Sequence, residues 1–147
     1  MIIERHIVIA VPIEEVYRVS QDYAVRYQWD PFPERIQLLD GAKKIEIGTK
    51  VRVFAKSGLQ MDVQFVQLDT PNRAAVVMIN GSRCLEKFAG SWIFRRESTD
   101  KTRVTFRYLI QMKVWAIPMI FGRLAAIYFS RMVNARMIGL KRYCEAS

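Results

Sequence analysis

Apolar and polar residues alternate along most of this chain, with the period of two that is typical of β-strands. In the segment 60–68, for example, Met61, Val63 and Phe65 share one face, while polar residues share the other. Turn sequences separate such segments, and Asn80-Gly81 strongly favours a hairpin. The pattern predicts strands at 3–10, 36–39, 50–55, 60–68, 73–79, 84–96 and 102–112.

Two short helices are predicted between the first two strands. The segment PIEEVYRVSQD begins with Pro12, which suits a first helical turn, and it carries two acidic residues where the helix dipole favours them. A second helix is predicted over 22–28, with Asp22 as its cap. The stretch YQWDPF, residues 27–32, ends this helix because the residue before a proline avoids the helical conformation.

A long C-terminal helix is predicted from Pro118 to about Tyr143. Strands with one apolar face need an apolar cover, and this helix is the only predicted element that is large enough to provide it. The predicted fold class is therefore α+β, with an antiparallel sheet packed against a long helix. The residues predicted to face inward recur at helical spacing and are Phe121, Leu124, Ala125, Tyr128, Met132, Ala135 and Gly139.

At 147 residues, the chain is expected to form a single domain over 1–147. Such a length buries a core without disulfide bonds or structural metals. The two cysteines, Cys84 and Cys144, have no metal-binding or redox spacing, so we expect reduced thiols in a cytoplasmic protein. The N-terminus places charges inside an alternating pattern, which predicts a strand and not a signal peptide.

The formal net charge of +9 favours anionic partners. Basic residues without any acidic residue occupy the segment 113–142, where we expect the polar side of an inward-packed helix. The alternative is that this segment rests on anionic membrane lipids. The apolar stretch 114–129 is too short and too interrupted to span a membrane. Basic residues are dispersed and match no base-reading motif, so no nucleic-acid partner is expected.

Three segments, IVIAVPIEEVYRVSQDY, WDPF and GSWIFRRESTDKTRVTFRY, together with the order of elements, resemble the polyketide cyclase/dehydrase-type branch of the START-like (SRPBCC) superfamily. The resemblance covers nearly the whole chain. It implies a helix-grip fold, in which a strongly bent antiparallel sheet of about seven strands wraps around a long C-terminal helix and leaves a deep apolar cavity. Members include lipid carriers, hormone receptors and aromatase/cyclases, so the resemblance is specific for fold and weak for function.

Aromatic and methionine residues are expected to line the cavity that this resemblance implies, since such pockets are mostly apolar and methionine adapts to varied ligands. An alternative is that Trp29 and Phe32 only plug a core, and that the helix packs closely on the sheet through its small residues. The expected ligand-binding residues are Trp29, Phe32, Met61, Phe65, Met78, Phe88, Trp92, Phe106, Tyr108, Met112, Phe121, Tyr128 and Met132.

Catalytic motifs are nearly absent from the sequence. The only histidine, His6, is expected to be structural or exposed, and neither a metal nor a cofactor is predicted. The inward polar candidates for catalysis are Glu86, Tyr108 and Tyr128. Glu86 has the strand parity of inward neighbours, but a buried carboxylate is costly unless it is paired. A bulge near Gly90 that turns Glu86 to solvent is the favoured alternative.

We therefore expect a cytoplasmic protein that binds an apolar or amphipathic small molecule, such as a lipid or a polyketide-like compound, under its C-terminal helix. One alternative is a polyketide cyclase, dehydratase or aromatase. Another is a lipid carrier that docks on anionic membrane surfaces.

Overall fold

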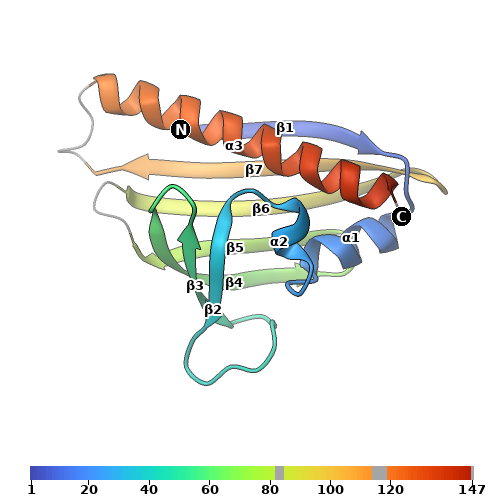
Figure 1. Ribbon diagram of the computed structural model, residues 1–147, viewed down its shortest axis with the longest axis horizontal. Helices are drawn as coiled ribbons and strands as arrows, with labels where there is room; N and C mark the ends of the chain where they lie inside the picture. Colours follow the sequence, from blue (N-terminus) through green and yellow to red (C-terminus); the bar gives the residue numbers. More distant parts are fainter. Residues whose placement is uncertain (82–84, 114–118, 147) are drawn as a thin grey trace.

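The structure is a computed structural model that describes residues 1–81, 85–113 and 119–146, with the backbone alone described for residues 119–122. One antiparallel sheet and one long helix dominate it (Figure 1). The described elements in chain order are β1 (Ile2–Ile9), α1 (Ile13–Gln21), α2 (Arg26–Trp29), β2 (Pro33–Leu38), β3 (Lys50–Ala55), β4 (Gln60–Asp69), β5 (Arg73–Asn80), β6 (Leu85–Ser98), β7 (Lys101–Met112) and α3 (Met119–Glu145).

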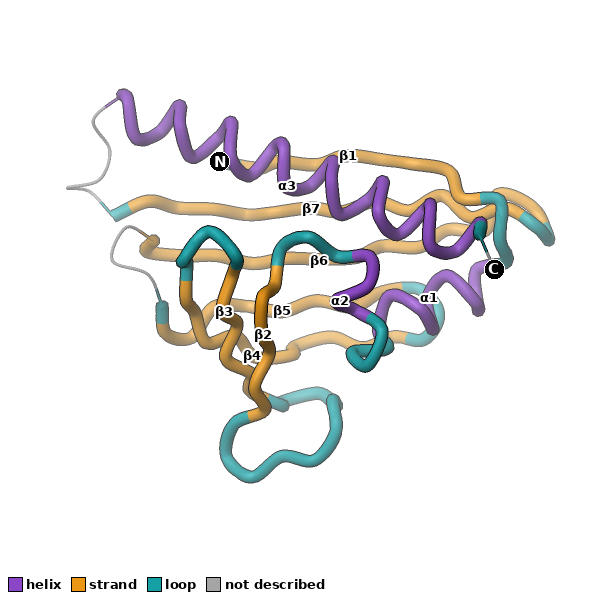
Figure 2. The backbone as a smooth tube through the Cα atoms, in the orientation of Figure 1, coloured by secondary structure: helices purple, strands orange, loops and turns teal. Residues whose placement is uncertain are grey.

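The seven described strands pair in the order β1-β7-β6-β5-β4-β3-β2, so β2 to β7 form a meander and β1 joins its far edge. Helix α3 packs along β1 and β7, and its C-terminal part contacts α1 and α2 (Figure 1). The backbone tube shows that the sheet curls until β2 and β3 pass in front of the strands β4 to β6 (Figure 2). This arrangement is the helix-grip fold that the sequence predicted.

Alternation along the strands explains how the sheet forms its core. In β7, for example, Val104, Phe106 and Tyr108 are buried while Arg103 and Arg107 are exposed. The exposed arginines form ion pairs with glutamates on the outer face, so this face is solvated. Strand β7 thus presents most of its apolar residues to the concave side of the sheet.

The second short helix is shorter than predicted. The sequence predicted a helix over 22–28 capped by Asp22, whereas α2 begins at Arg26. The Asp22 carboxylate accepts a hydrogen bond from the Ala24 N–H at 3.1 Å, so it stabilises the turn before the helix and does not cap the helix itself.

The predicted inward face of α3 is offset by one residue from the buried face, although Ala125, Tyr128 and Met132 still pack against the core as partly buried residues. Leu124 is 57% exposed and Ala135 is also exposed. A one-residue shift rotates a helix by about 100°, and both neighbouring stripes of α3 are largely apolar, so spacing alone did not distinguish them. The described α3 residues that are buried are Phe129, Val133, Arg136, Met137, Leu140 and Cys144.

Gly139 allows α3 to approach α2 closely. A Cβ atom added at Gly139 would overlap the backbone carbonyl oxygen of Trp29. The sequence left open whether the small residues of this helix make room for a ligand or allow close packing. At Gly139 the answer is close packing.

Within the part of the chain that the structure describes, no helix is both long and apolar enough to cross a membrane.

Candidate ligand-binding cavity

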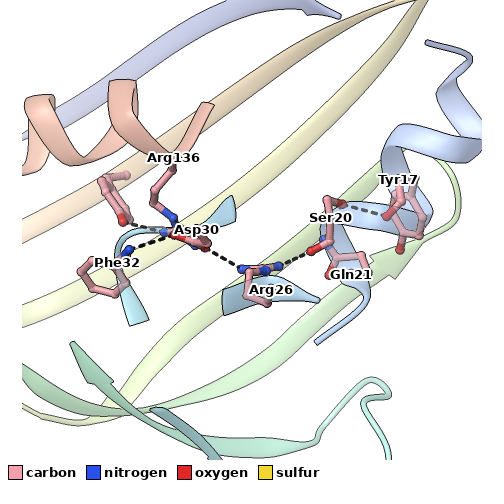
Figure 3. A network of polar contacts seen from close by, with 8 residues as sticks. Tyr17, Ser20, Gln21, Arg26, Asp30, Phe32 and Arg136 are labelled. Atoms are coloured by element: carbon pink, nitrogen blue, oxygen red, sulfur yellow. Dashed lines mark hydrogen bonds and ion pairs between the residues drawn. The ribbon is translucent and has the colours of Figure 1, made fainter. Parts of the chain in front are cut away.

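The YQWDPF turn places a buried carboxylate at the centre of an ion cluster. Asp30 follows α2 directly, and its side chain has no exposed surface. Its Oδ2 atom accepts hydrogen bonds from Arg136 Nη2 at 2.9 Å, from Arg136 Nε at 3.2 Å and from Arg26 Nη1 at 3.2 Å (Figure 3). Its Oδ1 atom accepts one from the Phe32 N–H at 3.0 Å. One carboxylate therefore faces two guanidinium groups.

Arg26 comes from α2 and lies one helical turn before Asp30, the spacing at which side chains on a helix meet. It also donates a hydrogen bond to the Ser20 carbonyl oxygen at the end of α1. Its guanidinium carbon lies 4.5 Å from the Tyr23 ring centroid and 5.0 Å from that of Trp29. Aromatic faces attract a cation, which helps to hold Arg26 in a position that is only 3% exposed.

Arg136 reaches the same carboxylate from α3. Its Nη1 atom donates a hydrogen bond to the Tyr108 hydroxyl at 2.7 Å, and its guanidinium carbon lies 4.8 Å from the Phe106 ring centroid. Burial alone would lower the pKa of Arg136, but Asp30 and Tyr108 outweigh burial and raise it, so this side chain stays charged. Burial raises the pKa of the Tyr108 phenol, with Arg136 opposing, so the phenol is neutral at physiological pH.

A cavity of about 80 Å³ lies beside this cluster. Its walls come from residues 21–36 and from the concave faces of β3 to β7. Arg26 and Arg136, which share Asp30, line it together with Gln21 and Tyr108, and we call this connected polar part of the lining the polar end of the cavity. Most of the remaining lining is apolar. Typical pockets for drug-sized ligands measure roughly 300–1,000 Å³, so a ligand with both a ring and a chain requires the walls to move apart.

The structure places about half of the predicted ligand-binding residues at this cavity. They are Phe32, Met61, Phe65, Phe88, Trp92, Phe106 and Tyr108. Phe88 and Trp92 come from the long strand β6, and Phe106 and Tyr108 come from its neighbour β7. Alternation along these strands therefore found the sheet side of the cavity.

The remaining predicted residues lie elsewhere. Trp29 packs edge-on against Trp92 at 5.9 Å between ring centroids and does not line the cavity, so it is a core plug. Met78 and Met112 are half-buried and pack against the core. Tyr128 and Met132 line a separate exterior groove on α3, together with Leu124 and Ile127. The Phe121 side chain lies outside the described residues.

From the sequence, the cavity was expected to lie under the length of α3. In the structure it does not. Among the α3 side chains that the structure describes, only Arg136 lines it. The segment 21–36 provides the wall that the helix was expected to provide, because Gly139 brings α3 into direct backbone contact with this segment.

Two of the three predicted catalytic candidates are not at the cavity. Glu86 is exposed and lies at a register shift between Leu85 and Lys87, so the alternative of an inward carboxylate is wrong. The favoured bulge exists, but at Glu86 itself and not at Gly90. The Tyr128 hydroxyl donates a hydrogen bond to Ser57 at 2.9 Å, in the turn between β3 and β4.

Tyr108 is the predicted catalytic candidate that lies at the cavity. Its raised pKa makes it a hydrogen-bond or proton donor at neutral pH and not a base. Among the described residues, no group of histidine, cysteine, aspartate and glutamate side chains is arranged to hold a metal ion.

The sequence analysis missed Arg26, Asp30 and Arg136. The i,i+4 spacing of Arg26 and Asp30 was visible, and so was a carboxylate set among three aromatic residues. Arg136 was counted only as one of the basic residues of the segment 113–142, although it lies between apolar neighbours of one helical stripe. Its partner lies 106 positions away, so no local pattern connects them.

The family model for "polyketide cyclase / dehydrase and lipid transport" matches residues 1–145. No curated protein is similar enough in sequence to count as a relative. Solved structures match over nearly the whole chain. A protein from Thermus thermophilus has a TM-score of 0.82 and 18% identity, with 99% of this chain and 98% of that one covered.

The Zhui aromatase/cyclase of Streptomyces sp. R1128 has a TM-score of 0.84 and 14% identity, with 99% and 93% covered. A START superfamily protein from Mycobacterium smegmatis has a TM-score of 0.76 and 12% identity, with 99% and 97% covered. At these identities, the structures show a shared fold. Family and fold together indicate a ligand-binding domain. The chain belongs to the polyketide cyclase/dehydrase and lipid transport family.

Proposed function

We propose that this protein binds a small, largely apolar ligand in the cavity between the concave face of the sheet and the segment 21–36. The observation that supports the proposal is the cavity itself, with its apolar lining on β3 to β7 and its polar end at Arg26 and Arg136. Removal of apolar surface from water contributes about 25 cal/mol per Å², which gives such a site its affinity before ordering costs are subtracted.

A ligand of lipid or polyketide size requires this cavity to widen. One place where widening costs little is the contact between α3 and the turn between β3 and β4, where Tyr128 and Ser57 share an exposed hydrogen bond. Tyr128 packs on Phe129, and Phe129 packs on the cavity residue Phe88 at 5.7 Å between ring centroids. A movement of this part of α3 therefore reaches the cavity wall through two aromatic contacts.

Mass spectrometry of small molecules released from the purified protein tests the proposal, and a cavity-filling variant sharpens it. Val63→Phe places a larger side chain in the lining, and we expect it to weaken the binding of any co-purified compound by about tenfold or more. Ile127→Phe, on the exterior groove of α3, is the matched control and should leave binding unchanged. Equal binding by the filled variant would overturn the proposal.

An enzyme of the cyclase or dehydratase type is the second candidate. The observation that favours it is the Tyr108 hydroxyl, which lines the cavity, stays neutral and is oriented by Arg136. Such a group can donate a hydrogen bond to a carbonyl oxygen as it becomes an enolate. In a turnover assay with an aromatic-forming poly-β-ketone, Tyr108→Phe should abolish product if the protein is an enzyme and should only change affinity if it is a carrier.

Docking on anionic membranes stays a prediction. Leu124 and Ile127 are exposed on α3, and the exposed Arg123 and Arg131 lie on the same helix. Sedimentation with acidic and neutral vesicles distinguishes the alternatives, since binding through these residues requires pelleting with acidic vesicles that decreases as salt is added.

A further inference from the structure

The ion cluster at the cavity carries one more positive than negative charge. Arg26 and Arg136 are 3% and 7% exposed, and Asp30 is their shared carboxylate partner. A buried charge without a counter-charge is unfavourable unless a further group compensates for it. The residues that carry the excess both line the cavity, so a ligand in the cavity is placed to supply the missing negative charge.

The Oδ2 atom of Asp30 has no remaining capacity to accept hydrogen bonds from the two arginines. Its two oxygen atoms already accept three bonds from guanidinium groups and one from the Phe32 N–H. Each carboxylate oxygen offers about two acceptor positions, so Oδ2, the atom that faces both arginines, has none left, while Oδ1 accepts only from the backbone. Any further donor of the two arginines needs another acceptor.

Two buried polar atoms at the same end of the cavity lack partners among the described residues. They are the Nε atom of Arg26, a donor, and the Oε1 atom of Gln21, an acceptor. Gln21 donates through its Nε2 atom to the Ser20 hydroxyl at 3.0 Å, and Figure 3 shows it beside Ser20, the residue whose carbonyl oxygen binds Arg26. Buried polar groups of this kind are normally paired, so the polar end of the cavity has hydrogen-bonding capacity that a ligand can use.

We propose that the ligand is an apolar molecule that carries one carboxylate or similar anionic oxygen group, bound at the polar end of the cavity by Arg26 and Arg136. The inference rests on the proposed function, since it names the chemical class of the ligand of that same cavity. The anionic group accepts from the guanidinium groups and from the Tyr108 hydroxyl, whose oxygen already accepts from Arg136 and whose proton is left to donate. The hydrocarbon part lies against the aromatic lining on β6 and β7.

Three probes of similar shape test this inference: benzoate, benzamide and toluene. Calorimetric titration of the purified full chain should show benzoate binding about tenfold or more tightly than benzamide, because hydrogen bonds to charged groups are the stronger ones. Toluene has no polar group, so its binding measures the apolar part of the cavity alone. Binding of toluene with no preference for benzoate over benzamide would overturn this inference and leave the proposed function standing, whereas binding of none of the three would overturn both.

The Arg26→Met variant locates the preference. It removes the excess positive charge and leaves Asp30 paired with Arg136, so benzoate should fall to within about twofold of benzamide while toluene binding is retained. Arg18→Met removes an exposed positive charge from α1 and is the matched control, which should keep the full preference. Thermal unfolding verifies that both variants fold. The comparison of the three probes on the unaltered chain does not depend on the variants and remains valid if either fails to fold. An unchanged benzoate preference in folded Arg26→Met would overturn the assignment.

Discussion

The two halves of α3 are held in different ways. From Phe129 onward the helix buries an apolar stripe against β1 and β7, its Arg136 joins the ion cluster, and Gly139 lies against the Trp29 backbone. Earlier in the helix, Leu124 and Ile127 are 57% and 50% exposed. The comparison shows that the C-terminal part of the helix is fixed to the YQWDPF turn. In the described residues 123–128, Leu124 and Ile127 bury little of their apolar surface, so we expect this part to move at lower cost.

Removal of the shared carboxylate should have the largest effect on the fixed half. Asp30→Asn leaves two buried guanidinium groups without a counter-charge, and removal of one partner of a buried ion pair costs about 3–5 kcal/mol. Urea unfolding measures the loss. Glu14→Gln, which breaks the exposed pair with Arg96, is the control and should change stability little. Similar losses in the two variants would contradict the distinction between buried and surface pairs.

The contact at Gly139 predicts that a Gly→Ala substitution, which normally stabilises a helix, lowers the stability of this protein. Helix propensity alone predicts that Gly→Ala within a helix stabilises by up to about 1 kcal/mol. At Gly139 the added methyl group meets the Trp29 carbonyl oxygen, so we expect Gly139→Ala to lower the free energy of unfolding by about 1–3 kcal/mol instead. Asn134→Ala, at an exposed position of the same helix, is the control and should not destabilise. A stabilised Gly139→Ala protein would show that the contact does not hold α3.

The Tyr108 phenol should make the free energy of unfolding decrease at alkaline pH. Because burial raises its pKa in the folded state, the unfolded chain releases this proton first, near pH 10. Its contribution to stability is complete below that pH and is lost as the pH rises through the folded-state pKa. Tyr108→Phe should therefore flatten the decline in unfolding free energy between about pH 9.5 and 11.5. The exposed Tyr27, replaced by Phe, provides the comparison, and an equal flattening there would remove the assignment to Tyr108.

A change in the part of α3 before Phe129 should alter the rate of ligand release more than the stability of the fold. Tyr128→Phe removes the hydrogen bond to Ser57, at a cost of about 0.5–1.5 kcal/mol, and should speed the release of a bound apolar fluorophore in stopped-flow measurements. Thr105→Val, which removes the exposed hydrogen bond to His6 on the outer face, should leave that rate unchanged. An identical release rate in Tyr128→Phe would place the opening elsewhere in the molecule.

Sequence patterns predicted the sheet well because side-chain alternation is a local property. The apolar positions of β4 and β7 face the core as expected, and β3 begins and ends at the predicted residues. The face of α3 was not predictable in the same way, since two adjacent apolar stripes compete and the correct one contains Arg136. A charged residue is buried at low cost only when a partner neutralises it, and the partner of Arg136 is Asp30, which is distant in sequence.

The cavity could be predicted only in part for a related reason. Periodicity identifies which residues face inward, and it correctly named Phe88 and Phe106. Whether inward side chains fill the available space depends on how closely the layers approach. That distance is set by contacts such as the one at Gly139, which no spacing rule reveals.

The position of Trp92 makes its indole fluorescence sensitive to the state of the cavity. Its indole lines the cavity and lies 4.3 Å from the Phe106 ring centroid and 5.6 Å from the Arg136 guanidinium carbon. The fluorescence emission of an indole responds to nearby charge and to water. Both change when a ligand occupies the cavity beside Trp92. We therefore expect the intrinsic fluorescence of the unlabelled chain to change when the proposed ligand binds.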